Sequence, residues 1–161
     1  MSDICASTGA QALAIRFEPM QIQDVDDVMV IEQDVYPHPW TRGNFIDSLN
    51  SGYQAWVLRN ASGVLIGYFL AMLAVDEAHL LNLSLRGDLH GKGIGRILLN
   101  KVCALAHEHG MKSVLLEVRP SNTRALAVYR HYGFIQVGLR KEYYPAAGNM
   151  REAAVVMRLV L

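Results

Sequence analysis

Residues 86–96 read Arg86-Gly87-Asp88-Leu89-His90-Gly91-Lys92-Gly93-Ile94-Gly95-Arg96. An apolar run over residues 80–85 precedes this stretch, and a helical pattern that includes Ile97 follows it. A strand that breaks into a glycine-rich turn and then a helix presents unpaired backbone N–H groups at the positive end of the helix dipole. Glycine also lets the backbone approach an anion closely, because it has no Cβ. The stretch therefore predicts a site for a phosphorylated ligand, with Lys92 and Arg96 adding positive charge.

Two common phosphate-binding patterns do not fit this loop. In the Walker pattern a Gly-Lys pair is followed by Ser or Thr, whereas Gly91-Lys92 is followed by Gly93. The dinucleotide pattern G-x-G-x-x-G fails because Gly95 is followed by Arg96, and because the loop lies past the middle of the chain rather than after the first strand. A plain connecting turn stays open as the alternative on the loop alone, since glycine occurs in turns for many reasons.

The composition is that of a globular domain with a sizeable core. The chain has 161 residues, of which 52% are hydrophobic and 19% are charged, and these values argue against disorder. The formal net charge is zero, so there is no overall electrostatic case for binding nucleic acid or an anionic membrane. No apolar run approaches the ~20 residues that a membrane span needs. We therefore expect neither nucleic acid nor a membrane as a direct partner.

The chain shows no targeting or metal-binding signature. Its start contains Asp3 and has no Lys or Arg before Arg16, which makes a poor signal peptide. Cys5 and Cys103 do not form a disulfide framework, and no Cys/His spacing indicates zinc, so no metal is expected. Cys103 lies in an apolar helical pattern and is expected to be a small core residue. We expect a cytoplasmic protein, and the sequence sets no oligomeric state.

The apolar pattern alternates between strand and helix periods along the chain. Residues 1–13 are expected to be a flexible lead-in, and residues 14–161 a single domain. Asp24 and Thr41 are expected to cap two helices, and Gly110 to end a third with a left-handed residue. Expected strands lie at 15–17, 54–58, 64–74, 79–85, 113–118, 134–139 and 153–159, and the two later helices at 94–109 and 122–131. Strands thus precede, flank and follow the helices, which predicts a mixed α/β or α+β sheet.

The order of these motifs resembles the GCN5-related N-acetyltransferase (GNAT) family. The acyl-CoA loop of that family, (Gln/Arg)-x-x-Gly-x-(Gly/Ala), would correspond to residues 90–95, with His90 in place of Gln or Arg. Residues 115–122, Tyr143-Tyr144-Pro145 and Pro37-x-Pro39-Trp40 resemble more narrowly its ribosomal-protein-alanine (RimI-type) branch. That branch has Asp-Pro where this chain has Arg86-Gly87. The resemblance implies a GNAT fold: a mixed, mostly antiparallel sheet of roughly six to seven strands, about four flanking helices, and a V-shaped splay between the two central strands.

The resemblance also implies direct transfer from acetyl-CoA to an amine in a ternary complex, with Glu117 as general base and Tyr129 as general acid. A desolvated glutamate has a raised pKa, which suits proton acceptance near neutrality. A phenol stays protonated at neutral pH and can protonate the departing thiolate. Two plainer alternatives stay open. Glu117 would lie on the polar face of its strand and pair with a neighbour such as Arg119, and Tyr129 would pack in the core beside Leu126 and Phe134.

The implied acetyl-CoA site joins one strand, the loop and one helix start. Leu83, Ser84 and Leu85 would line the acyl-pantetheine channel, where a backbone N–H would stabilise the thioester oxygen. Asn122 would hold the pantetheine arm or the rest of the coenzyme. The loop contributions would come from His90, Gly91, Lys92, Gly93, Ile94, Gly95 and Arg96.

The expected acceptor is an N-terminal amine. At pH 7 roughly a tenth of peptide α-amines but well under a thousandth of lysine amines are neutral and able to attack a thioester. Trp40, Tyr143 and Tyr144 are expected to frame a peptide N-terminus, with local packing as their alternative role. Acidic candidates for the substrate ammonium are Glu32, Asp34 and Glu142, among which the sequence does not choose. The resemblance implies the N-terminal alanine of a small-subunit ribosomal protein as substrate. Two alternatives are a small-molecule or lysine amine as acceptor, and a non-catalytic CoA-binding module.

Overall fold

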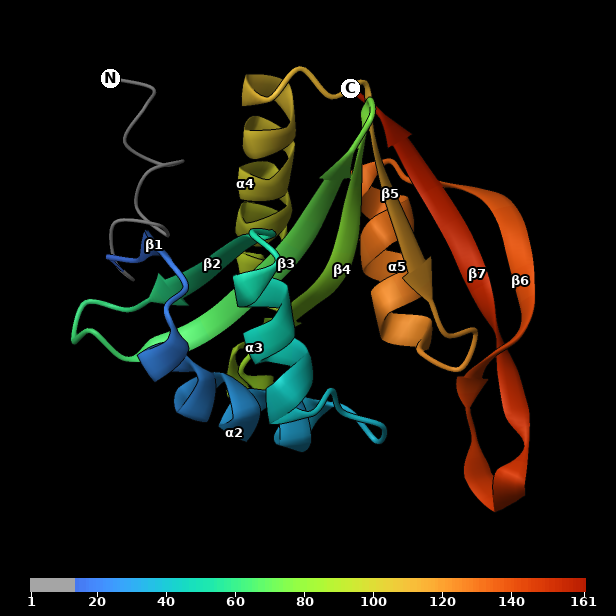
Figure 1. Ribbon diagram of the computed structural model, residues 1–161, viewed down its shortest axis with the longest axis horizontal. Helices are drawn as coiled ribbons and strands as arrows, with labels where there is room; N and C mark the ends of the chain where they lie inside the picture. The colour runs from blue at the N-terminus through green and yellow to red at the C-terminus, as the bar shows by residue number, and fades with distance from the viewer. Residues whose placement is uncertain (1–13) are drawn as a thin grey trace.

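The computed structural model describes residues 14–161, which form one seven-stranded sheet of order β1-β2-β3-β4-β5-β7-β6 (Figure 1). Its strands are β1 (Arg16–Pro19), β2 (Gln54–Arg59), β3 (Leu65–Ala74), β4 (Glu77–Leu85), β5 (Ser113–Val118), β6 (Ile135–Pro145) and β7 (Arg151–Val160). Neighbouring strands are antiparallel except β4 and β5, which are parallel. The expected mixed, mostly antiparallel sheet is confirmed. The expected flexible lead-in over residues 1–13, which includes Cys5, lies outside the described residues.

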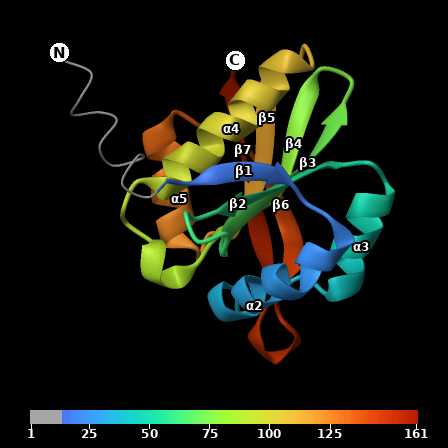
Figure 2. The ribbon, with the colours of Figure 1, turned by 90° about the vertical axis from the view of Figure 1, so that its left-hand side faces the viewer.

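Helices cover both faces of this sheet. The α-helices are α2 (Val25–Val35), α3 (Arg42–Asn50), α4 (Ile94–Glu108) and α5 (Thr123–Tyr132), and the short 3-10 helices are η1 (Ile22–Asp24), η2 (Gly87–Leu89) and η3 (Ala147–Asn149). Figure 2 shows α3 and α4 on opposite sides of the strands. Within residues 14–161, no helix combines the length and the apolar character needed to cross a membrane.

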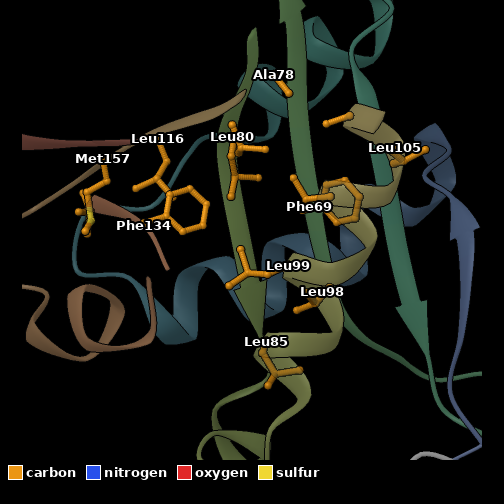
Figure 3. Close-up of a cluster of buried hydrophobic side chains, with 14 of the residues drawn as sticks. Phe69, Ala78, Leu80, Leu85, Leu98, Leu99, Leu105, Leu116, Phe134 and Met157 are labelled. Atoms are coloured by element: carbon orange, nitrogen blue, oxygen red, sulfur yellow. The ribbon is translucent and has the colours of Figure 1, made fainter. Parts of the chain in front are cut away.

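Each face of the sheet has its own hydrophobic cluster. On the α4 face, Leu98 and Leu99 are fully buried against strand residues that include Phe69 and Leu116 (Figure 3). On the α2 and α3 face, the cluster includes Val28, Phe45 and Tyr68. The strands between the two clusters are therefore covered on both sides, which explains why β3 reads as a continuous apolar run rather than as an alternating pattern.

The two central strands separate at one end. β4 pairs with β5 only from Glu77 to Leu80, which pairs with Leu116. Beyond that point β4 continues along β3 as far as Leu85, and β5 continues along β7 as far as Val118. The expected V-shaped splay is thus confirmed, and the β4 edge that faces it has no strand partner there.

A β-bulge at Leu81 changes which side chains of β4 face α2. Leu70 and Ala71 of β3 pair with Asn82 and Leu80, so that Leu81 is the extra residue. Leu80 packs in the α4 cluster, whereas Asn82 bonds to a residue of α2. Without the bulge, Leu80 and Asn82 would share one face.

Two of the expected helix caps are confirmed, whereas a third cap and one expected strand end are wrong. Thr41 caps α3 as expected, with its hydroxyl accepting from the Asn44 N–H at 3.1 Å. Asp24 does not cap α2, because its buried carboxylate accepts from the Gln21 N–H at 2.8 Å and from Arg59 at 2.6 Å. The expected strand at 134–139 extends to Pro145, since the β6–β7 hairpin continues past an irregular segment between Arg140 and Tyr144. Gly110 follows α4 with a φ of +73°, as expected.

Candidate active site

The glycine-rich loop leads from η2 directly into α4. Gly91 and Gly93 have φ values of +78° and +81°, and Gly93 is the N-cap of α4. Gly95 has no such left-handed backbone, and a Cβ built there meets nothing within 4 Å. Lys92 and Arg96 are both exposed beside this open space. The first N–H groups of α4 therefore face a space that an anion can enter.

His90 fixes the start of this loop. Its Nε2 lies 2.7 Å from the Leu85 carbonyl oxygen, and its Nδ1 lies 2.5 Å from a guanidinium nitrogen of Arg124. A guanidinium only donates, so Nδ1 accepts and the ring proton is on Nε2, which donates to Leu85. His90 thus ties the loop to both β4 and α5. It also brings the Arg124 cation to the loop, a contact that spans 34 residues and left no signal in the sequence.

Backbone donors of β4 point into the splay. The Leu83 carbonyl accepts from the Tyr36 hydroxyl at 2.7 Å, and the Leu85 carbonyl from His90. In an antiparallel ladder the N–H and C=O of one residue point to the same side. The N–H groups of Leu83 and Leu85 therefore face the splay rather than β3, where they are available to a thioester oxygen. The backbone N–H and C=O of Ser84, in contrast, face β3, where Ser84 pairs with Tyr68. Its buried hydroxyl lies 3.1 Å from Tyr36 Oη.

Glu117 lies on β5 just beyond the end of its pairing with β4. Its side chain is 15% exposed, with Oε1 3.3 Å from Arg140 and 3.9 Å from His79 Nε2. Glu117 thus pairs with a cation, as its plainer alternative requires, but this cation is Arg140. Arg119 instead donates to the Pro145 carbonyl at 2.6 Å. Arg140 and His79 were missed in the sequence, because they reach Glu117 from β6 and β4.

Tyr129 has a packed ring and a free hydroxyl. The ring lies edge-on to Phe134 with centroids 5.6 Å apart, as the packing alternative requires. Its hydroxyl bonds to no other side chain or backbone group of residues 14–161. Burial raises the pKa of Tyr129, and the nearby phenols of Tyr36 and Tyr144 raise it further. The Tyr129 phenol therefore stays protonated across the physiological pH range.

The remaining cofactor candidates contribute backbone or capping groups. Ile94 is 1% exposed and belongs to the core, so its side chain does not reach a ligand. Asn122 is the N-cap of α5, with its side-chain oxygen accepting from the Ala125 N–H at 3.2 Å. Only the amide Nδ2 of Asn122 is left to donate to another group.

The aromatic substrate candidates fall into two groups. Tyr144 lies under Arg119 with the guanidinium 4.3 Å from its ring centre, and its pKa is raised by burial and then by nearby Glu117. Tyr143 meets Tyr144 edge-on, with the ring centres 4.8 Å apart. Trp40 is separate: it packs on Phe45 and lines a groove of about 410 Å³ between α3 and the bulge of β4. Figure 1 shows the α2–α3 loop and the β6–β7 hairpin at the same end of the sheet.

The acidic candidates are distinguished by burial. Glu32 is 1% exposed, and both of its oxygens accept hydrogen bonds from within the chain, so it does not reach a substrate. Asp34 and Glu142 are exposed. Among residues 14–161, no cluster of three or more His, Cys, Asp and Glu side chains is arranged to hold a metal ion.

Comparison with known proteins identifies the family. Residues 25–134 match the model of the Acetyltransferase (GNAT) family. This chain belongs to the GNAT family. GNAT acetyltransferases use acetyl-CoA, and the open space before Gly95, with the first N–H groups of α4 and the cations of Lys92, Arg96 and Arg124 around it, fits a pyrophosphate.

The GNAT relatives extend over most of the chain. A putative ribosomal protein bS18-alanine N-acetyltransferase of Bacillus subtilis is 30% identical over 139 residues, covering 86% of this chain and 90% of the relative. The ribosomal protein bS18-alanine N-acetyltransferase of Haemophilus influenzae is 34% identical and covers 86% of this chain and 93% of the relative. The crystal structure of the ribosomal-protein-S18-alanine N-acetyltransferase from Escherichia coli superposes with a TM-score of 0.81 at 29% identity, covering 91% of this chain and 93% of that one.

Proposed function

We propose that this GNAT protein transfers the acetyl group of acetyl-CoA to the α-amine of an N-terminal alanine on a small-subunit ribosomal protein. The main support is the position of Glu117, a largely buried carboxylate where the β4–β5 ladder opens. The relatives named for this activity on bS18 match 86% of the chain. The burial of Glu117, the opening between β4 and β5 and the similarity to these relatives all support the same reaction.

Each proposed catalytic group has one task. Glu117 accepts the proton of the attacking amine, directly or through a water molecule. One backbone N–H of the free β4 edge, that of Leu83 or that of Leu85, donates to the thioester oxygen as the new C–N bond forms and negative charge develops there. Tyr129 gives its proton to the sulfur as the C–S bond breaks, so the products are the amide and the free thiol. Glu117 then releases the amine proton to water and Tyr129 takes one back from water, which restores both groups. The loop and Asn122 hold the acetyl donor.

The basicity of the acceptor favours an α-amine. Taking the proton from a lysine rather than from an α-amine costs about 3.4 kcal/mol more at neutral pH, from the difference of roughly 2.5 pKa units. A single carboxylate such as Glu117 is suited to the smaller cost. The zero net charge of the chain offers no general attraction to polyamines.

Mass spectrometry of peptides incubated with acetyl-CoA tests the proposal. The set contains a peptide that begins Ala-Arg with a free amine, the same peptide N-blocked but carrying Lys, and spermidine. Acetylation of the free α-amine alone is the expected result. Modification of the lysine or of spermidine would replace the substrate class, and CoA binding without any product would leave a non-catalytic module.

A further inference from the structure

Glu32 is a buried carboxylate surrounded by hydrogen-bond donors. Oε1 accepts from the Trp40 backbone N–H at 3.0 Å, Oε2 accepts from the Tyr68 hydroxyl at 2.5 Å, and Asn82 Nδ2 lies 3.2 and 3.1 Å from the two oxygens. The N–H groups of Trp40 and Asn82 can only donate, so the carboxyl oxygens of Glu32 accept from both, and the Tyr68 hydroxyl completes the set. No lysine or arginine of residues 14–161 forms an ion pair with Glu32. These three groups, rather than a counter-ion, satisfy the buried carboxyl group.

One side of this network reaches the splay. The Asn82 side-chain oxygen lies 3.2 Å from Ser84 Oγ, which lies 3.1 Å from Tyr36 Oη. The Tyr36 hydroxyl in turn donates to the Leu83 carbonyl at 2.7 Å. The bulge in β4 makes this chain of contacts possible, because it turns Asn82 and Ser84 toward α2. Glu32 is therefore connected to the strand edge that faces the acyl group.

The other side of the network holds the loop between α2 and α3. This loop, residues 36–41, contains Pro37 and Pro39, which have no N–H to donate. Its first residue, Tyr36, is anchored through its hydroxyl and Trp40 through its backbone N–H. Both anchors lead back to Glu32. Glu32 thus holds the backbone of Trp40, whose ring packs on Phe45 and lines the groove of α3 and β4.

We infer that Glu32 is a positioning residue for the acceptor peptide, which it serves by fixing the loop over residues 36–41 against β4. This role rests on the proposed function, because it assumes that the peptide N-terminus contacts this loop. Glu32 itself touches no substrate, since its oxygens are occupied and buried. No hydrogen bond of the Glu32 network reaches residues 90–96 within the described part of the chain. Peptide binding should therefore depend on Glu32 far more than acetyl-CoA binding does.

Glu32→Gln compared with Asp24→Asn tests this inference. Both variants replace a buried carboxyl group by an amide of nearly the same volume, but Asp24 bonds to Gln21 and Arg59 rather than to the loop. In Glu32→Gln one of the two oxygens becomes an N–H₂ group, which cannot accept from the N–H groups of Trp40 or Asn82. We expect its KM for the Ala-Arg peptide to rise about tenfold or more, with the KM for acetyl-CoA within about threefold. Asp24→Asn should leave both KM values near those of the wild type, whatever its thermal stability.

Hydrogen exchange of the Trp40 amide supplies a readout that needs no activity. The exchange rate should rise about tenfold or more in Glu32→Gln and stay unchanged in Asp24→Asn. The same KM changes in both variants, or an unchanged Trp40 exchange rate in Glu32→Gln, would overturn the role of Glu32. If the wild-type protein acetylates no peptide, the proposed function fails, and the exchange rates still support or overturn the anchoring of the loop.

Discussion

Gly93 and Gly95 lie two residues apart at the start of α4, yet only Gly93 has a left-handed backbone, with a φ of +81°. Gly93 is required by its own conformation, because a side chain in that region is strained. Gly95 has helical neighbours and open space where its Cβ would stand. The chain itself thus gives no reason for glycine at position 95, whereas a bound anion would.

Gly95→Ala should therefore separate stability from binding. Alanine in a helix is favoured over glycine by about 0.5–1 kcal/mol, so the variant should unfold at an equal or higher temperature. Its Cβ should weaken acetyl-CoA binding, because it enters the space before the helix N–H groups. Calorimetric titration and thermal unfolding measure the two effects. Gly93→Ala is the matched control and should lose about 1 kcal/mol of stability. Unchanged acetyl-CoA affinity in Gly95→Ala would show that the coenzyme binds elsewhere.

Removing the two loop cations should act on the coenzyme rather than on the chemistry. The double variant Lys92→Ala with Arg96→Ala removes exposed charges beside the open space, and these side chains form no ion pair with residues 14–161. We expect the KM for acetyl-CoA to rise about tenfold or more while kcat changes little. Steady-state kinetics at saturating peptide measure both constants. A pure loss of kcat would contradict the assignment of this loop to phosphate binding.

The fold was largely predictable because the apolar residues recur at regular helix or strand spacings along most of the chain. The strand at residues 113–118 and the start of α4 at Ile94 were predicted at their observed positions. The extension of β6 to Pro145 was not, because the irregular segment at Glu142, with a φ of +51°, interrupts the alternation. Asp24 was misread as a cap because a carboxylate before an apolar pattern looks the same whether it binds a helix end or Arg59.

The active site was less predictable than the fold. Only the family resemblance indicates catalytic roles for Glu117 and Tyr129, since composition and spacing alone favour plainer roles for both. Tyr36 was missed because its contact with Leu83 spans 47 residues and depends on the β4 bulge. A bulge reverses the facing of every later residue in its strand, and simple alternation does not reveal it.

Glu117→Gln should reduce turnover most strongly where the amine is protonated. The amide keeps the shape of the side chain but accepts no proton, so kcat/KM at pH 7 should fall about 100-fold or more. The loss should shrink toward pH 9, because more of the amine is already neutral there. The control is Arg140→Gln, which removes the ion pair but keeps the carboxylate. An equal loss in both variants would mean that Glu117 acts through its pairing with Arg140 and not as a base.

The activity should persist at alkaline pH because Tyr129 stays protonated. Burial raises the pKa of Tyr129, so the phenol holds its proton to a higher pH than free tyrosine, whose pKa is about 10. We expect kcat/KM to rise with pH until the α-amine is neutral, at about pH 8, and then to stay level to about pH 10. A pH–rate profile of the wild type checks this. A fall with a midpoint below pH 10, absent in Tyr129→Phe, would show that Tyr129 ionises too early to be the acid.

Glu152 should make the protein acid-sensitive by joining the β6–β7 hairpin to the start of α5. Its carboxylate accepts from the Ser121 N–H at 2.7 Å and hydroxyl at 2.9 Å, and it lies 3.5 Å from Arg119. The Ser121 bonds, and then Arg119, hold the pKa of Glu152 below its usual range. A lowered carboxyl pKa adds stability above the unfolded value of about 4.3, and that stability is lost as the pH falls through the folded value.

Thermal unfolding of the wild type and of Glu152→Gln at pH 7 and pH 3 measures this contribution. At pH 7 the wild type should unfold about 2–4 °C higher, and at pH 3 the difference should be smaller, because protonation of Glu152 removes the charge that its partners stabilise. Glu142→Gln is the control: this carboxylate is exposed in the same hairpin and forms no ion pair with residues 14–161, so no such difference is expected. If the unfolding temperatures of the wild type and of Glu152→Gln differ equally at both pH values, the shape of the Glu152 side chain holds the hairpin, and its charge does not.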